Sequence, residues 1–175
     1  MEKSLAWRLS DKYGTTDPFR IARELKIKII YFSAARQKGF SQIISRNVFI
    51  YINQNLSPAM QRMVCAHELG HALLHKEYLK SGKEMLHMEL FDMTNITEYE
   101  ANVFAAELLI DEDKMYELFR EGYGIAQVAS CLGININLLL IRLYELQKKS
   151  HLIDLPMIPD PRFLGKIEDV NEEYR

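Results

Sequence analysis

Cysteine is scarce in this sequence of 175 residues, since Cys65 and Cys131 are its only two and stand far apart. They form no C-x-x-C pair, which argues against a disulfide framework and against a cysteine-ligated zinc site. Cys65 precedes His67 by two positions, or about 200° around a helix, so it faces away from anything that His67 binds. We expect both cysteines to be core residues.

The sequence also lacks an excess of positive charge and a long apolar run. Lys plus Arg number 22 against 24 Asp plus Glu, so there is no bulk positive charge to hold a polyanion through counterion release. No stretch approaches the roughly 18 apolar residues of a membrane span, and residues 1–13 lack the apolar core of a secretion signal. We therefore expect a cytoplasmic protein that contacts neither membrane nor nucleic acid directly.

Strand patterns are confined to the first third of the chain. Asp17 with Pro18 predicts the start of a short helix, and Ser57 with Pro58 that of a long helix reaching about Lys76. The other expected elements are strands at Ile27–Phe32, Gln42–Ser45 and Val48–Asn53, an irregular connection at Glu77–Asn95, and helices at Thr97–Ile110, Lys114–Arg120, Ile125–Leu132 and Asn137–Lys148. The last two strands, separated by a plausible tight turn at 46–47, favour a small and largely antiparallel sheet.

The strongest chemical signal is HELGH, His67 to His71, inside the long predicted helix. Residues four apart lie on one side of a helix, so both imidazoles can reach one zinc ion. Glu68 lies about 100° around the helix from His67, where it can touch a metal-bound water without binding the metal. Zinc lowers the pKa of its water to about 7, and a neighbouring carboxylate can relay the proton. We therefore predict that Glu68 is a general base.

A catalytic zinc ion needs a third protein ligand, and the helix predicted after Thr97 offers two candidates. Glu98 and Glu100 flank its apolar stripe on opposite sides, and geometry leans only slightly towards Glu98. Thr97 and Glu100 have the spacing of a capping box, which would give Glu100 a structural role. Asn102, one turn after Glu98, could accept the remaining N–H of a ligand histidine. Glu98 is the predicted ligand, and Glu100 stays the alternative.

Other polar side chains near the motif have less specific expectations. His75 lies well off the direction of His67, so we expect a supporting or helix-terminal role and not a fourth ligand. His87, Tyr78 and Tyr99 could stabilise an oxyanion, but an ordinary partly buried side chain is the better interpretation of each.

Two blocks of the sequence resemble the ImmA/IrrE-type metallopeptidases: HELGHALLH at His67–His75 and EYEANVFAAELL at Glu98–Leu109. The order of elements is similar from about residue 17 to 147. Many members read LLMP after the second block, whereas this chain has LLID at residues 108–111. That departure puts the following turn in doubt, not the metal site.

The resemblance implies a gluzincin site in which His67, His71 and Glu98 bind Zn²⁺ and Glu68 is the catalytic base. It also implies a narrow substrate range, because such peptidases typically cleave one transcriptional repressor. The expected partner is a helix-turn-helix repressor of a mobile element or of a stress response.

A helix-turn-helix pattern at Ile125–Leu146, with Gly133 at its turn, offers the main alternative: a metal-binding, DNA-associated regulator without peptidase activity. Its second helix is mostly Leu and Ile, with Arg142 offset by Glu145, whereas a recognition helix needs exposed Arg, Lys, Asn or Gln. We interpret it as a packing element or a protein-docking surface. A third reading is an inactive interaction protein, against which the presence of Glu68 argues.

These patterns predict an α+β, zincin-like metallopeptidase domain over residues 1–150, which includes the helical segment 124–148. A small sheet is expected to pack on the helix that carries HELGH. A Pro-containing acidic tail follows at 151–175. Substrate docking is expected either at Leu138–Leu146 or in the tail at Leu155–Leu164.

Overall fold

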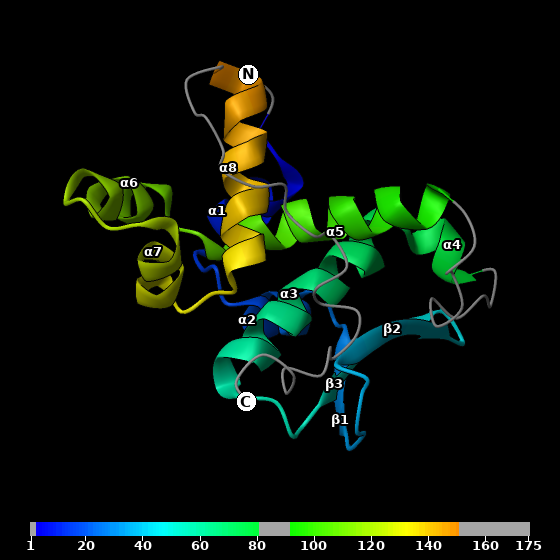
Figure 1. Cartoon of the computed structure of the whole chain (residues 1–175). Coiled ribbons are helices and arrows are strands. Elements are labelled where there is room, and N and C mark those ends of the chain that lie inside the picture. The colour runs from blue at the N-terminus through cyan, green and yellow to red at the C-terminus, as the bar shows by residue number, and fades with distance from the viewer. Residues whose placement is uncertain (1–2, 81–91, 151–175) are drawn as a thin grey trace.

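The computed structural model describes residues 3–80 and 92–150 and has the expected α+β class, with a small sheet packed on the helix that carries HELGH (Figure 1). Its elements, in chain order, are α1 (Leu5–Tyr13), α2 (Pro18–Glu24), β1 (Lys28–Phe32), β2 (Gly39–Ile44), β3 (Asn47–Asn53), α3 (Pro58–Leu74), α4 (Lys76–Lys80), α5 (Asp92–Leu109), α6 (Glu112–Arg120), α7 (Ile125–Leu132) and α8 (Ile136–Ser150).

The sheet is mixed, with strand order β1-β3-β2. β2 and β3 form the expected antiparallel pair, but β1 runs parallel to β3. The connection between β1 and β2 carries the chain to the opposite edge of β3, and the buried Asn53 holds it there. The Asn53 amide donates to the carbonyl groups of Ala34 and Gln37, both at 2.8 Å. Strand periodicity carries no information on this order.

Helix α3 lies between the sheet and α5 (Figure 1). Ser57 caps its first turn by accepting from the Met60 amide at 3.3 Å. Its middle is buried on all sides, from Met63 to Ala72. Gly70 allows the closest approach to α5, because a Cβ at that position would lie 3.1 Å from both Cα and the carbonyl oxygen of Ala101.

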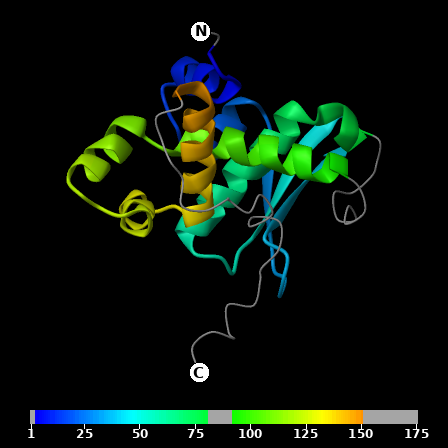
Figure 2. The ribbon, with the colours of Figure 1, turned by 45° about the horizontal axis from the view of Figure 1, so that its top comes forward.

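Helix α8 crosses α5 and buries its apolar residues there and against α7, while α6 and α7 extend to one side (Figure 2). Leu138 to Ile141 have no exposed surface. Arg142 and Leu143 are also buried, so Leu138–Leu143 confirm the interpretation as a packing element and are wrong as a docking surface. Tyr144, within the other part of the expected surface, is 38% exposed. Arg142 pairs with Glu107 at 3.2 Å and with Glu112.

Several boundaries differ from the sequence-based expectations. α1 was not expected, and α4 lies where an irregular connection was predicted. α5 begins at Asp92, so Thr97 is inside the helix and cannot be its N-cap. Cys65 is buried as expected, but Cys131 is exposed because it lies on the outer side of α7.

No single helix in residues 3–80 and 92–150 has the length and apolarity to cross a membrane. α7 and α8 reach that threshold only as a pair, which is bent by 110°.

Gly70→Ala tests the close contact between α3 and α5. Alanine raises helix propensity by about 1 kcal/mol, but the added methyl group overpacks against α5 backbone at a cost of about 1–3 kcal/mol. We expect the free energy of unfolding, measured by urea denaturation, to stay equal or fall by up to about 2 kcal/mol. A clear gain in stability would contradict the tight contact.

Candidate metal centre

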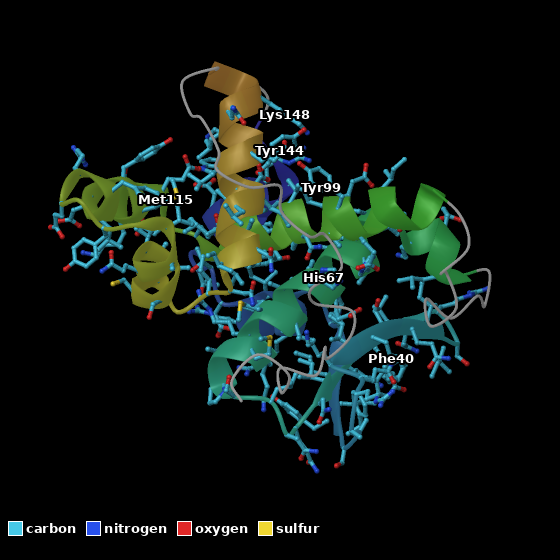
Figure 3. The ribbon with its side chains drawn as sticks, viewed as in Figure 1. Phe40, His67, Tyr99, Met115, Tyr144 and Lys148 are labelled. Atoms are coloured by element: carbon cyan, nitrogen blue, oxygen red, sulfur yellow. The ribbon has the colours of Figure 1, made fainter. Side chains whose placement is uncertain are left out.

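Three side chains converge where α3 passes α5. His67 and His71 lie on consecutive turns of α3, and their Nε2 atoms are 3.0 Å apart. Glu98, on α5, places Oε2 3.3 Å from the His67 Nε2 and Oε1 3.3 Å from the His71 Nε2. Figure 3 labels His67 on α3 beside this contact with α5. The three residues form a group whose possible ligand atoms all lie within 4.8 Å of one another.

The spacing and chemistry of these atoms fit a tetrahedral metal ion. Zinc ligands at about 2.0–2.1 Å from the ion lie about 3.4 Å from one another, close to the separations seen here. The His67 Nδ1 is 2.9 Å from the Asn102 Oδ1, which can only accept, so that ring nitrogen carries a proton and Nε2 can present its lone pair. Oε2 of Glu98 is buried and has no hydrogen bond of normal geometry within the described chain.

Burial and the mutual contacts of the three groups shift the pKa of each one. Burial opposes ionisation of Glu98, but the neighbouring histidines outweigh it and hold the pKa of that carboxyl group well below its ordinary value. Burial also opposes a charge on His67, yet the hydrogen bond with Glu98 raises the pKa of that imidazole. Burial, reinforced by the charge of His67, lowers the pKa of His71 to about 4.

Glu68 lies beside the converging atoms without joining them. Burial raises the pKa of the Glu68 carboxyl group to about 7, against the opposing effect of His67. The buried Ser41 hydroxyl, on β2, also favours the ionised form, although it makes no hydrogen bond of normal geometry within the described residues. Sequence reasoning missed Ser41, because nothing in a strand pattern indicates which residue will face a helix that follows it.

Glu98, and not the alternative ligand Glu100, lies with His67 and His71 in the cluster. The Glu100 Oε2 instead lies 2.9 Å from the His75 Nε2, and the His75 Nδ1 lies 3.1 Å from the Nδ1 of His71. His75 is therefore a supporting side chain, as expected. Asn102 also has the position expected of it, beside His67.

None of the three oxyanion candidates is placed at the cluster by the described residues. Tyr99 donates to Glu145 on α8, and Figure 3 labels Tyr99 near Tyr144 and Lys148 where the two helices meet. His87 and the side chain of Tyr78 lie outside the described residues.

Comparison with known proteins gives concordant matches. A family model for a peptidase family, described as the IrrE N-terminal-like domain, matches residues 22–144. The chain is 38% identical over 133 residues to "Uncharacterized immunity region protein 2" of Bacillus phage phi105, covering 75% of this chain and 82% of that protein. It is 27% identical over 133 residues to "Metallopeptidase ImmA" of Bacillus subtilis (strain 168), covering 70% and 72%.

The cluster predicts one divalent metal ion per chain. We expect His71→Ala and Glu98→Ala each to lose stoichiometric metal, because the site needs three protein ligands and each variant keeps only two. Glu117→Ala, which removes an exposed carboxylate on α6, is the matched control and should keep it. Elemental analysis of the purified proteins measures this, and stoichiometric metal in Glu98→Ala would remove that residue from the site.

Proposed function

This chain belongs to the ImmA/IrrE family of metallopeptidases, and from that premise we propose that it is a zinc-dependent endopeptidase that cleaves a specific helix-turn-helix repressor. The observation that carries the proposal is the convergence of His67, His71 and Glu98, with a buried carboxyl group beside them. The two imidazoles and one carboxylate are a donor set typical of zinc hydrolases, and leave a fourth position for water or substrate.

In the proposed mechanism, His67, His71 and Glu98 hold the ion, and Asn102 fixes the ring of His67 by accepting its Nδ1–H. A bound zinc ion would supply an acidified water and polarise the scissile carbonyl group. The proposed task of Glu68 is a different one, because Glu68 follows His67 in the chain but does not belong to the group of converging ligand atoms.

Glu68 is the proposed general base, and its environment suits that role. A carboxyl group with a pKa of about 7 takes a proton from water and returns it to the leaving amine with little penalty in either direction. Ser41 favours the ionised form, which is the form that must receive the proton.

Glu68→Gln separates metal binding from chemistry. The amide keeps the shape of the side chain but cannot accept the proton, so we expect a loss of cleavage of about 100-fold or more, with metal content and unfolding temperature unchanged. Glu117→Gln, which changes an exposed carboxylate on α6, is the control that should cleave like wild type. Undiminished cleavage by the Glu68→Gln variant would contradict a mechanism in which Glu68 is the general base.

A repressor is the proposed substrate for two reasons. The family resemblance implies cleavage of one regulator, and the similar protein of Bacillus phage phi105 carries a name that assigns it to an immunity region. The formal net charge of −2 offers no route to that target through DNA, so recognition must come from protein contacts.

The alternative is a DNA-associated regulator without peptidase activity. The angle between α7 and α8 supports it, but the burial of α8 argues more strongly against it. α7 and α8 meet at 110°, within the range of a helix-turn-helix. However, Leu138–Ile141 of α8 are packed in the core, and Arg142 is 7% exposed and paired with two carboxylates. A recognition helix needs exposed donors at that place.

Cleavage and DNA binding can be compared directly in one set of experiments. We expect the protein to cut a co-encoded helix-turn-helix regulator at one or a few sites and to leave casein nearly untouched. The rival predicts a sequence-specific mobility shift that falls steeply with salt. Such a shift, without cleavage of the regulator, would overturn the proposal.

The tail at 151–175 lies outside the described residues and is the proposed docking element, since most of the alternative on α8, Leu138–Leu143, is buried. Deleting the chain after Ser150 should weaken repressor cleavage at low substrate concentration, because docking raises the local concentration at the site. Metal content should stay stoichiometric. Unchanged kcat/KM for the repressor would place docking elsewhere.

A further inference from the structure

A continuous polar chain leads from the candidate metal centre to the surface. His71 and His75 lie one turn apart at the end of α3, with their Nδ1 atoms 3.1 Å apart. On its other side, the His75 Nε2 is 2.9 Å from the Oε2 of Glu100, on α5. The two imidazoles are buried, at 2% and 8% side-chain exposure, whereas Glu100 is 53% exposed. The chain therefore ends at a half-exposed carboxyl group.

The direction of each hydrogen bond in this chain follows from the chemistry of its two ends. The His71 Nε2 faces the cluster, so it must present a lone pair to an ion, and the proton of the neutral ring then lies on Nδ1. A carboxylate oxygen of Glu100 can only accept, so the proton of the His75 ring lies on Nε2. The His75 Nδ1 is thereby left as an acceptor, facing the Nδ1–H of His71.

The opposite direction would block the site. If the His75 Nδ1 donated, the His71 Nδ1 would have to accept, and its proton would move to Nε2, where a metal must bind. When the His75 ring carries a single proton, Glu100 excludes this arrangement by requiring that proton at the His75 Nε2. Asn102 fixes the tautomer of His67 directly, because its Oδ1 accepts a hydrogen bond from the Nδ1–H of that ring.

We propose that His75 and Glu100 are positioning residues that hold His71 in its metal-binding tautomer through the hydrogen bonds His71 Nδ1–H to His75 Nδ1 and His75 Nε2–H to Glu100. This inference rests on the proposed function, since it assigns the partners of a proposed metal ligand. It gives Glu100, which sequence reasoning set against Glu98 as a ligand, a separate role at the far end of the chain.

Asn and Leu at position 75 have nearly the same shape, but only Asn offers a hydrogen-bond acceptor. Asn places its Oδ1 one bond from Cγ, where the histidine ring has Nδ1, so it can still accept from His71. Leu places a methyl group there and leaves the buried Nδ1–H of His71 without an acceptor. The comparison therefore isolates hydrogen-bond acceptance from packing.

Zinc affinity of the full chain, measured by competition with a chromogenic chelator, is the primary readout. We expect His75→Leu to bind zinc about 10- to 100-fold more weakly than wild type, and His75→Asn to recover most of that loss. Thermal unfolding of the zinc-free variants shows that both fold. Equal affinities for His75→Leu and His75→Asn, whether weak or like wild type, would overturn the proposal.

The hydrogen-bond direction can be tested without any substitution. In the zinc-loaded wild-type protein, long-range proton–nitrogen NMR spectra of the imidazole rings should show His75 protonated on Nε2 alone. A proton on the His75 Nδ1 would overturn the inference even if zinc binds. A wild-type chain that binds no zinc would instead overturn the proposed function, and with it this inference.

Discussion

The contact between α3 and α5 at Gly70 is the constraint on which the site depends. His67 and His71 flank that glycine on α3, and Glu98 lies one turn before its contact, Ala101, on α5. The missing side chain lets the helices approach until atoms of both reach one point. Because a metal ligand must be placed to within about 0.5 Å, the packing of these helices decides the site as directly as its polar residues do.

Burial of the cluster costs free energy of hydration, and hydrogen bonds from neighbouring side chains offset part of that cost. Two imidazoles and two carboxyl groups in a core would each lose hydration, and the pKa values of Glu68 and His71, about 7 and about 4, record that loss. Asn102 compensates by accepting a hydrogen bond from the Nδ1–H of His67, and in the proposed arrangement His75 accepts one from the Nδ1–H of His71. The His67 Nε2, the His71 Nε2 and the Glu98 carboxylate can then face one another as acceptors, which a bound cation would satisfy.

Features with a short sequence signature could be predicted, and those built from distant residues could not. HELGH specified the shared face of His67 and His71, because four residues make about one helical turn. The choice of Glu98 over Glu100 rested partly on a capping box, which was wrong because α5 starts earlier. The position of Ser41 beside Glu68 and the parallel pairing of β1 depend on how the strands fold back. The periodicity of residues within a strand does not indicate this. Gly39 could have indicated that β2 lies close to α3, since glycine inside a strand often marks a close approach. A Cβ on Gly39 would come within 2.4 Å of Val64, on α3.

Helix α8 illustrates how one pattern can serve two structures. Its angle to α7 is that of a helix-turn-helix, but it contacts α5 at two places, through Arg142 with Glu107 near one end of α5 and through Glu145 with Tyr99 near the ligand end. Tyr99 follows Glu98 directly, so α8 supports the segment of α5 that supplies the third candidate ligand. A helix fixed in this way cannot also lie in a DNA groove without releasing α5. The same burial that removes α8 as a reader of DNA therefore makes it part of the frame that holds the metal centre.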